Sequence, residues 1–262
     1  HHHPDHRGQR RADAERAAVD AGGAFGMLVR DRGDAPELLD VRRFRNDWEK
    51  HASLQLRLGN TDVIDTYLER DRVTPGTYED ILDAAYQAWL ADQVAGKTSV
   101  LIAETLDTVS ELNTRARTDR ILAGEVALEG VKLHDGNEAS RGDLIITRRN
   151  DRRLPLGRGW VKNGDRWEVV RAGNDGSLAV RRAHSKWRTT ITLPATYVAE
   201  HVELGYAITA HRAQGSTVDT AHAIVHSPEV TRESLYVAMT RGRESNRVYV
   251  ATDQHHLEEH QY

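Results

Sequence analysis

The sequence contains no cysteine among its 262 residues. This absence excludes disulfides, thiolate metal ligands and a cysteine nucleophile, and it suits a reducing compartment. The sequence also lacks any run of about 18 apolar residues and any charged-then-apolar N-terminal segment, so we expect no membrane-spanning helix and no secretory signal. Together these absences predict a cytoplasmic protein without a membrane partner.

Methionine is missing from the first position, and the chain opens with HHHPDH. We therefore expect a fragment of a longer protein. Three adjacent histidines can bind a metal ion, but no further ligands stand at the spacing of a metal site. We predict that the chain has no metal site of its own.

An overall positive charge is also missing. The formal net charge is -4 at pH 7, which argues against a generic nucleic-acid binder of high pI. The charge is unevenly distributed, because residues 141–188 hold 13 Lys and Arg against 5 Asp and Glu. Such a block is typical of a solvated face and equally of a surface that grips a phosphate backbone. Charge alone leaves both interpretations open.

The first part of the chain is predicted to be helical and then α/β. Apolar residues recur at helical spacing over residues 38–58. Thr77 is expected to cap a helix that ends before Gly96. The run TSVLIAE, from Thr98, is typical of a strand buried on both faces of a parallel sheet, and residues 105–122 have helical spacing. This strand-helix step predicts an α/β domain.

The periodicity changes over residues 141–198, where short alternating runs such as RWEVVRA and SLAVRR are separated by turn signals. The spacing of these runs predicts a five-stranded barrel of the SH3 or OB type, coincident with the basic block. A strand at AHAIV, a helix at ESLYVAMTRG and a last strand at RVYVAT then follow. We therefore predict a parallel-sheet α/β domain with a small β-barrel inserted into it.

Two segments carry a resemblance to a known family. GYAITAHRAQGSTVD, from Gly205, and ESLYVAMTRGRESNRVYV, from Glu233, resemble motifs V and VI of superfamily 1 helicases. Their details are similar to the motor of conjugative relaxase-helicases of the MobF type and of their RecD-like relatives. The pair in this order is a more specific signal than either segment alone.

Further upstream the resemblance is weaker. LLDVRRFRNDWE, from Leu38, resembles motif IV, and AAVDAGGAFGML resembles the segment that follows motif III. Motif III itself departs from the family, because RADAER stands where the family has Gly-Asp and then Gln. The contact with the nucleotide that this Gln makes in the family is therefore in doubt here.

The resemblance implies nucleotide-side roles for four residues. Arg241 would be an arginine finger, since phosphoryl transfer needs positive charge around the γ-phosphate. The alternative is a surface arginine paired with Glu233 or Glu244. Gln214 and Gly215 would approach a phosphate through their backbone. Arg43, with Arg42 as the neighbouring candidate, would be the motif IV arginine that reaches the nucleotide.

We expect contacts with DNA from two parts of the sequence. Thr209 and His211 match the family's contacts with the backbone of single-stranded DNA. In the basic segment, Arg148, Arg149, Lys162 and Trp160 are candidates for phosphate contacts and base stacking. The alternative for Trp160, Trp167 and Trp187 is that they fill the core of a small barrel.

The resemblance covers residues 18–252 and implies a RecA-like second motor domain with an inserted SH3-like β unit. The expected divisions are a flexible lead-in at 1–20, a helical segment joining the two motor domains at 21–98, the RecA-like domain at 99–139 and 199–253, the inserted unit at 140–198, and a tail at 254–262.

A phosphate loop of the form G-x-x-x-x-G-K-[ST] is absent from the sequence, and the GKT at Gly96 follows a helix instead of a strand. ATP and Mg²⁺ would therefore be bound mainly by an N-terminal RecA-like partner domain, and we do not expect hydrolysis by this chain alone. The favoured function is part of an ATP-dependent 5′-to-3′ DNA helicase of conjugation. The alternatives are a non-catalytic DNA- or partner-binding module and a hydrolase using His211 with Asp219, for which no nucleophile is evident.

Overall fold

The computed structural model describes residues 43–60, 62–184, 189–226 and 230–252. The predictions for the histidine cluster, the lead-in, the motif III region, Arg42, Trp187 and the tail lie outside the described residues. Two compact units are present, one built from residues 43–104 and 217–252, which we call unit 1, and the other from Thr105–Ser216, which we call unit 2.

Unit 1 is built on parallel strands. They lie in the order β1, β14, β13, β2, and each neighbouring pair is parallel. All five residues of β2 are buried, and since alternate side chains point to opposite faces of a sheet, both faces are covered here. This confirms the predicted α/β fold with a parallel sheet. The strands are β1 (Val73–Gly76), β2 (Ser99–Ala103), β13 (Val218–Val225) and β14 (Gly242–Ala251).

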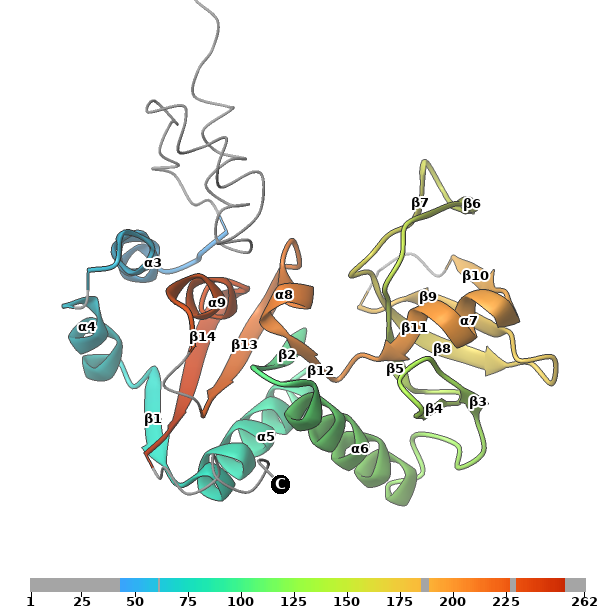
Figure 1. Ribbon diagram of the computed structural model, residues 1–262, viewed down its shortest axis with the longest axis horizontal. Coiled ribbons are helices and arrows are strands. Elements are labelled where there is room, and N and C mark those ends of the chain that lie inside the picture. Colours follow the sequence, from blue (N-terminus) through green and yellow to red (C-terminus); the bar gives the residue numbers. More distant parts are fainter. Residues whose placement is uncertain (1–42, 61, 185–188, 227–229, 253–262) are drawn as a thin grey trace, which may run out of the picture. The chain divides into compact units, whose positions relative to one another are not determined.

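Helix α5 (Tyr78–Val94) packs against β2, β13 and β14 of this sheet (Figure 1). As predicted, Thr77 caps it, with its hydroxyl oxygen accepting a hydrogen bond from the backbone N–H of Asp80 at 3.2 Å. The helix ends just before Gly96, whose φ of 74° favours glycine. The GKT sequence therefore lies between a helix and a strand, the reverse of a phosphate loop.

Three further helices complete the described part of unit 1: α3 (Asp47–Leu58), α4 (Val63–Glu69) and α9 (Arg232–Ala238). The prediction for α9 was wrong at its end, since it placed Arg241 on the helix. The helix stops at Ala238 because Thr240 Oγ1 donates to Tyr236 O at 2.8 Å and Arg241 Nε donates to Val237 O at 2.8 Å. Arg241 lies in the turn between α9 and β14.

Unit 2 contains an antiparallel sheet in the strand order β10, β9, β8, β5, β11. The pairings among the described residues leave β10 and β11 at its two ends, so closure into an SH3-like barrel stays a prediction. Trp167 is fully buried and donates to Thr147 Oγ1 at 3.2 Å, so it belongs to the core. The sheet strands are β5 (Leu144–Thr147), β8 (Arg166–Ala172), β9 (Leu178–Arg182), β10 (Thr190–Leu193) and β11 (Val202–Leu204).

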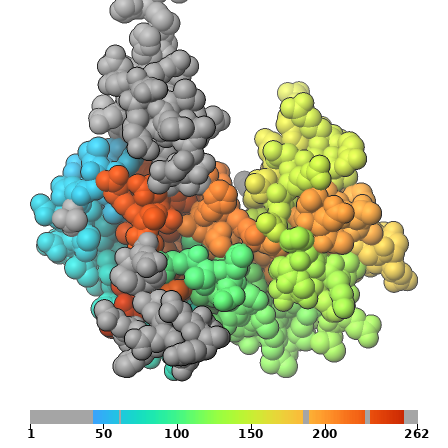
Figure 2. All heavy atoms as spheres, viewed as in Figure 1, coloured from blue at the N-terminus to red at the C-terminus, as the bar shows by residue number. Residues whose placement is uncertain are grey.

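The other elements of unit 2 come before, between and after the strands of this sheet in the sequence. Thr105 caps the predicted helix α6 (Leu106–Leu122) by accepting from the N–H of Thr108 at 3.2 Å. The hairpin of β6 and β7 projects from the rest of its unit (Figures 1 and 2). In the described part of the chain no helix is long and apolar enough to cross a bilayer. The remaining elements are β3 (Val131–Lys132), β4 (Glu138–Ala139), β6 (Asp151–Leu156), β7 (Gly159–Val161), α7 (Ala195–His201), β12 (Ala207–Thr209) and α8 (Ala210–Ala213).

Candidate functional site

Arg241 is buried in the turn after α9, with 5% of the residue exposed. Its Nε donates to Val237 O and its Nη2 donates to Thr240 Oγ1, both at 2.8 Å. These bonds fix one edge of the guanidinium against the end of α9. Because the residue is buried, the alternative of an exposed surface arginine is wrong.

Arg43 approaches the same turn from the segment ahead of α3. Its Nη1 donates to Thr240 O at 2.7 Å. The structure therefore brings together the two arginines predicted to contact a nucleotide, Arg43 and Arg241, around the hydroxyl and carbonyl oxygens of Thr240. They are separated by nearly the whole described chain, and only the fold makes them neighbours.

The segment ahead of α3 also contacts the residues that follow Arg241. The backbone N–H of Arg45 donates to Arg243 O at 2.8 Å, and Asn46 Nδ2 donates to Glu244 O at 3.0 Å. The side chain of Arg45 forms an ion pair with Glu244. The motif IV-like and motif VI-like segments thus lie side by side in unit 1.

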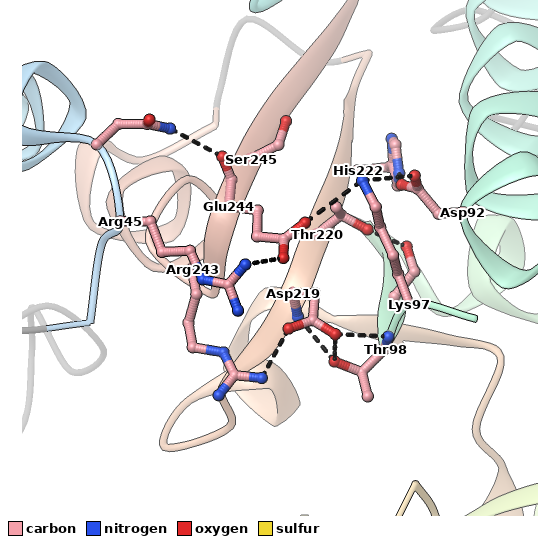
Figure 3. Close-up of polar contacts among 12 residues, drawn as sticks. Arg45, Asp92, Lys97, Thr98, Asp219, Thr220, His222, Arg243, Glu244 and Ser245 are labelled. Atoms are coloured by element: carbon pink, nitrogen blue, oxygen red, sulfur yellow. Dashed lines mark hydrogen bonds and ion pairs between the residues drawn. The ribbon is translucent and has the colours of Figure 1, made fainter. Parts of the chain in front are cut away.

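A polar network lies where β13 and β14 begin (Figure 3). One carboxylate oxygen of Asp219 accepts from the N–H and hydroxyl of Thr98 at 2.9 and 2.8 Å. The other accepts from Arg243 Nη2 at 2.7 Å. Burial disfavours the charged carboxylate, but the hydrogen bonds from Thr98 and Arg243 outweigh it and lower the pKa of Asp219. Asp219 is therefore engaged as an ion-pair partner in unit 1, whereas His211 belongs to unit 2.

A second part of this network is centred on His222, which is buried (Figure 3). Its Nε2 lies 2.8 Å from a carboxylate oxygen of Asp92, and its Nδ1 lies 3.0 Å from the hydroxyl of Tyr249. Lys97 pairs with both Asp92 at 3.8 Å and Glu244 at 3.3 Å. Sequence reasoning missed these residues and Arg243, since no motif joins positions so far apart along the chain.

The remaining residues predicted to contact the nucleotide or the DNA backbone belong to unit 2. They lie at the end of β12 and in the turn after it. The Thr209 hydroxyl caps α8 by accepting from the N–H of Arg212 at 3.4 Å. His211 and Gln214 are exposed. Gly215 has a φ of 81°, which favours glycine, and a side chain there would meet no neighbouring heavy atom. The space beside Gly215 is therefore open, whereas the backbone N–H of Gln214 donates to His211 O at 3.4 Å.

Trp160 lies in the β6–β7 hairpin and lines a cavity of about 430 Å³ together with Lys162 and Arg182. The guanidinium of Arg152 lies 5.0 Å from the centre of the Trp160 ring, and the ammonium of Lys162 lies 5.6 Å from it. Unlike Trp167, Trp160 is only half-buried. Of these two tryptophans, the structure leaves Trp160 accessible.

The positive charge of unit 2 is partly offset within the unit. Arg148 pairs with Glu203 at 2.6 Å, and Arg149 lies 3.1 Å from the Nε2 of His201. Other arginines of the unit also pair with carboxylates, among them Arg153 with Asp151, Arg181 with Glu168, and Arg182 with Asp165. The number of basic residues therefore overstates how many cations of this surface are available to a phosphate backbone.

Two family models match parts of this chain, an AAA domain over residues 13–78 and a UvrD-like helicase C-terminal domain over residues 204–249. The Probable conjugal transfer protein TraA of Sinorhizobium fredii is 32% identical over 235 residues, which are 88% of this chain and 20% of the relative. The ATP-dependent RecD2 DNA helicase of Deinococcus radiodurans is 32% identical over 124 residues, which are 44% of this chain and 15% of the relative.

The chain is a superfamily 1 helicase-type domain of the conjugative kind. A crystal structure of Bacteroides Pif1 bound to ssDNA shares the fold of this helicase-type domain, with a TM-score of 0.50 at 16% identity over 80% of this chain and 50% of that one. The helicase-type domain spans only 20% of the length of the TraA relative. Arg43 lies in the first matched segment and Arg241 in the second.

Proposed function

We propose that this chain is the second RecA-like motor unit of an ATP-dependent 5′-to-3′ DNA helicase that processes DNA in conjugation. The observation that carries the proposal is the meeting of Arg43 and Arg241 at Thr240. Two guanidinium groups that contact Thr240 from different segments form a cationic site of the kind that stabilises a transferring phosphoryl group. The similarity to TraA and RecD2 supports the link to conjugation and DNA unwinding.

In this proposal Arg241 is the arginine finger. Its bonds to Val237 and Thr240 support the role, because a guanidinium that is already held in place loses little entropy when it contacts a phosphate. Arg43 is the second cation of unit 1. In unit 2, the turn formed by Gln214 and Gly215 is proposed as a separate phosphate contact through the backbone N–H of Gly215.

The residues present fit the phosphates of ATP but not the magnesium ion. No group of three or more His, Cys, Asp or Glu side chains within residues 43–252, apart from the gaps given above, can hold a metal ion. The sequence also has no phosphate loop. The ligands of Mg²⁺ and most contacts with ATP would therefore come from a separate RecA-like domain. The arginines of unit 1 would complete the site.

Single-stranded DNA is the proposed partner of unit 2. Trp160 offers an accessible ring beside a cavity, and Lys162 lies next to it, a combination suited to stacking a base and neutralising its phosphate. Arg148 and Arg149 extend the positive charge toward β11. Thr209 and His211 are proposed to contact the DNA backbone.

The test is ATP hydrolysis with and without single-stranded DNA, measured for this chain alone and for this chain mixed with a separate RecA-like domain that contains a phosphate loop. The proposal expects no turnover by the chain alone and DNA-stimulated turnover by the mixture. Turnover by the chain alone would contradict it.

A second candidate is a non-catalytic DNA-binding module. The observation that favours it is the use of Arg241 as a cap for α9, since a buried arginine can serve the helix end alone. Under this alternative the chain binds single-stranded DNA, and the mixture shows no more hydrolysis than the phosphate-loop domain by itself.

A further inference from the structure

The residue after Arg241 is clamped by a single side chain. Asn246 Oδ1 accepts from the backbone N–H of Gly242 at 2.7 Å, and Asn246 Nδ2 donates to Gly242 O at 2.9 Å. Asn246 is fully buried. Gly242 leaves no space for a larger residue, because an added Cβ would collide with Ser245 O. The amide of Asn246 therefore fixes both backbone polar groups of Gly242, the residue that follows Arg241.

Asn246 is in turn held from α3 by Glu49. One carboxylate oxygen of Glu49 accepts from both the backbone N–H and the Nδ2 of Asn246, at 3.0 and 2.9 Å. Glu49 is fully buried, and within the described residues its other carboxylate oxygen has no hydrogen-bond partner. The two residues thus connect α3 to the Arg241 turn through an unbroken series of hydrogen bonds.

Stability alone does not account for this arrangement. A buried carboxylate with an unpartnered oxygen is costly, and an apolar side chain would join α3 to β14 without that cost. Burial raises the pKa of Glu49, although the hydrogen bonds from Asn246 and the charge of Arg72 partly offset this effect. What the polar pair supplies, and an apolar pair would not, is a fixed orientation of the Gly242 peptide groups.

We propose that Glu49 and Asn246 are positioning residues that hold Arg241 in place for phosphate contact. The inference rests on the proposed role of Arg241 in hydrolysis. In this arrangement a displacement of α3 would reach Arg241 through Glu49, Asn246 and Gly242.

The experiment follows the Nε–H of Arg241 by NMR in the full chain, with the signal assigned by its loss in Arg241→Lys. Loss of one supporting hydrogen bond is expected to speed exchange of this proton by about tenfold. Asn246→Ala and Glu49→Leu should both show that increase. Glu49→Gln should not, because its amide oxygen still accepts from Asn246. Ser53→Ala is the control, since Ser53 is buried in the same helix but donates to Lys50 O.

Slow Arg241 exchange in folded Asn246→Ala or folded Glu49→Leu would overturn the proposal. Glu49→Leu removes a buried charge and still fills the site, so it decides the matter if Asn246→Ala does not fold. Equal acceleration in Ser53→Ala would also overturn it, by showing a general loosening of α3. In the hydrolysis mixture, Asn246→Ala should lower kcat and leave the KM for ATP unchanged. If Arg241→Ala leaves hydrolysis intact, the proposed function fails, whereas the NMR result still reports on positioning.

Discussion

Replacing Asp219 by alanine should destabilise unit 1 measurably. The carboxylate accepts hydrogen bonds from the N–H and hydroxyl of Thr98 and from Arg243. A hydrogen bond to a charged group contributes about 1.5 kcal/mol. The Arg243 side chain is 43% exposed, so its ion pair adds only about 0.5 kcal/mol. We expect Asp219→Ala to lower the free energy of unfolding by about 3.5 kcal/mol.

The assay is urea unfolding followed by tryptophan fluorescence. Asp219→Asn, which keeps one oxygen for Thr98, should lose about 1 kcal/mol. Asp65→Ala, at an exposed carboxylate of α4, is the control and should change stability by less than about 0.5 kcal/mol. If Asp219→Ala loses no more than this control, the network does not stabilise unit 1 and the reasoning is refuted.

The contribution of Asp219 should also depend on pH. Since the folded protein lowers the pKa of this carboxyl group, the stabilisation is present above the unfolded pKa of about 3.9 and is lost as pH falls through the lower folded value. The difference between the original chain and Asp219→Ala should therefore be full at pH 7 and shrink in acid. A difference that stays constant down to pH 2 would contradict the assigned cause.

Other predictions concern DNA binding and the turn. Trp160→Ala should weaken binding of single-stranded DNA by about tenfold or more in a fluorescence anisotropy titration, as expected for a lost base stack; unchanged affinity would remove Trp160 from the DNA surface. Lys162→Ala should reduce the slope of log affinity against log salt by about one, unlike Lys132→Ala on β3. Gly242→Ala should cost about 1–3 kcal/mol of stability because its Cβ would meet Ser245 O, whereas Gly159→Ala, which meets only ordinary contacts, should be nearly neutral in the same urea assay.

The sequence predicts the elements whose signals are local. Thr77 and Thr105 cap their helices because a threonine hydroxyl satisfies an N–H two or three residues ahead, and β2 is buried because its residues are almost continuously apolar. The motif V-like and motif VI-like segments are likewise local patterns, and the matching helicase model spans both.

Long-range contacts are what the sequence does not predict. The position of Arg241 off the helix depends on which side chains take the last carbonyls of α9, a competition that apolar periodicity does not describe. Glu49 and Asn246 are 197 positions apart, and nothing in either local pattern connects them. Composition likewise treats Trp160 and Trp167 alike, yet only the fold makes one accessible and buries the other.

The most direct test of the account compares Arg241→Ala with Arg57→Ala in the DNA-stimulated hydrolysis mixture, with DNA affinity measured in parallel. Arg57, in the last turn of α3, is the arginine control. Loss of an arginine finger should lower kcat by about 10³-fold or more, with DNA affinity unchanged and Arg57→Ala close to the original chain. Hydrolysis by Arg241→Ala at the rate of the Arg57→Ala control would contradict the central claim.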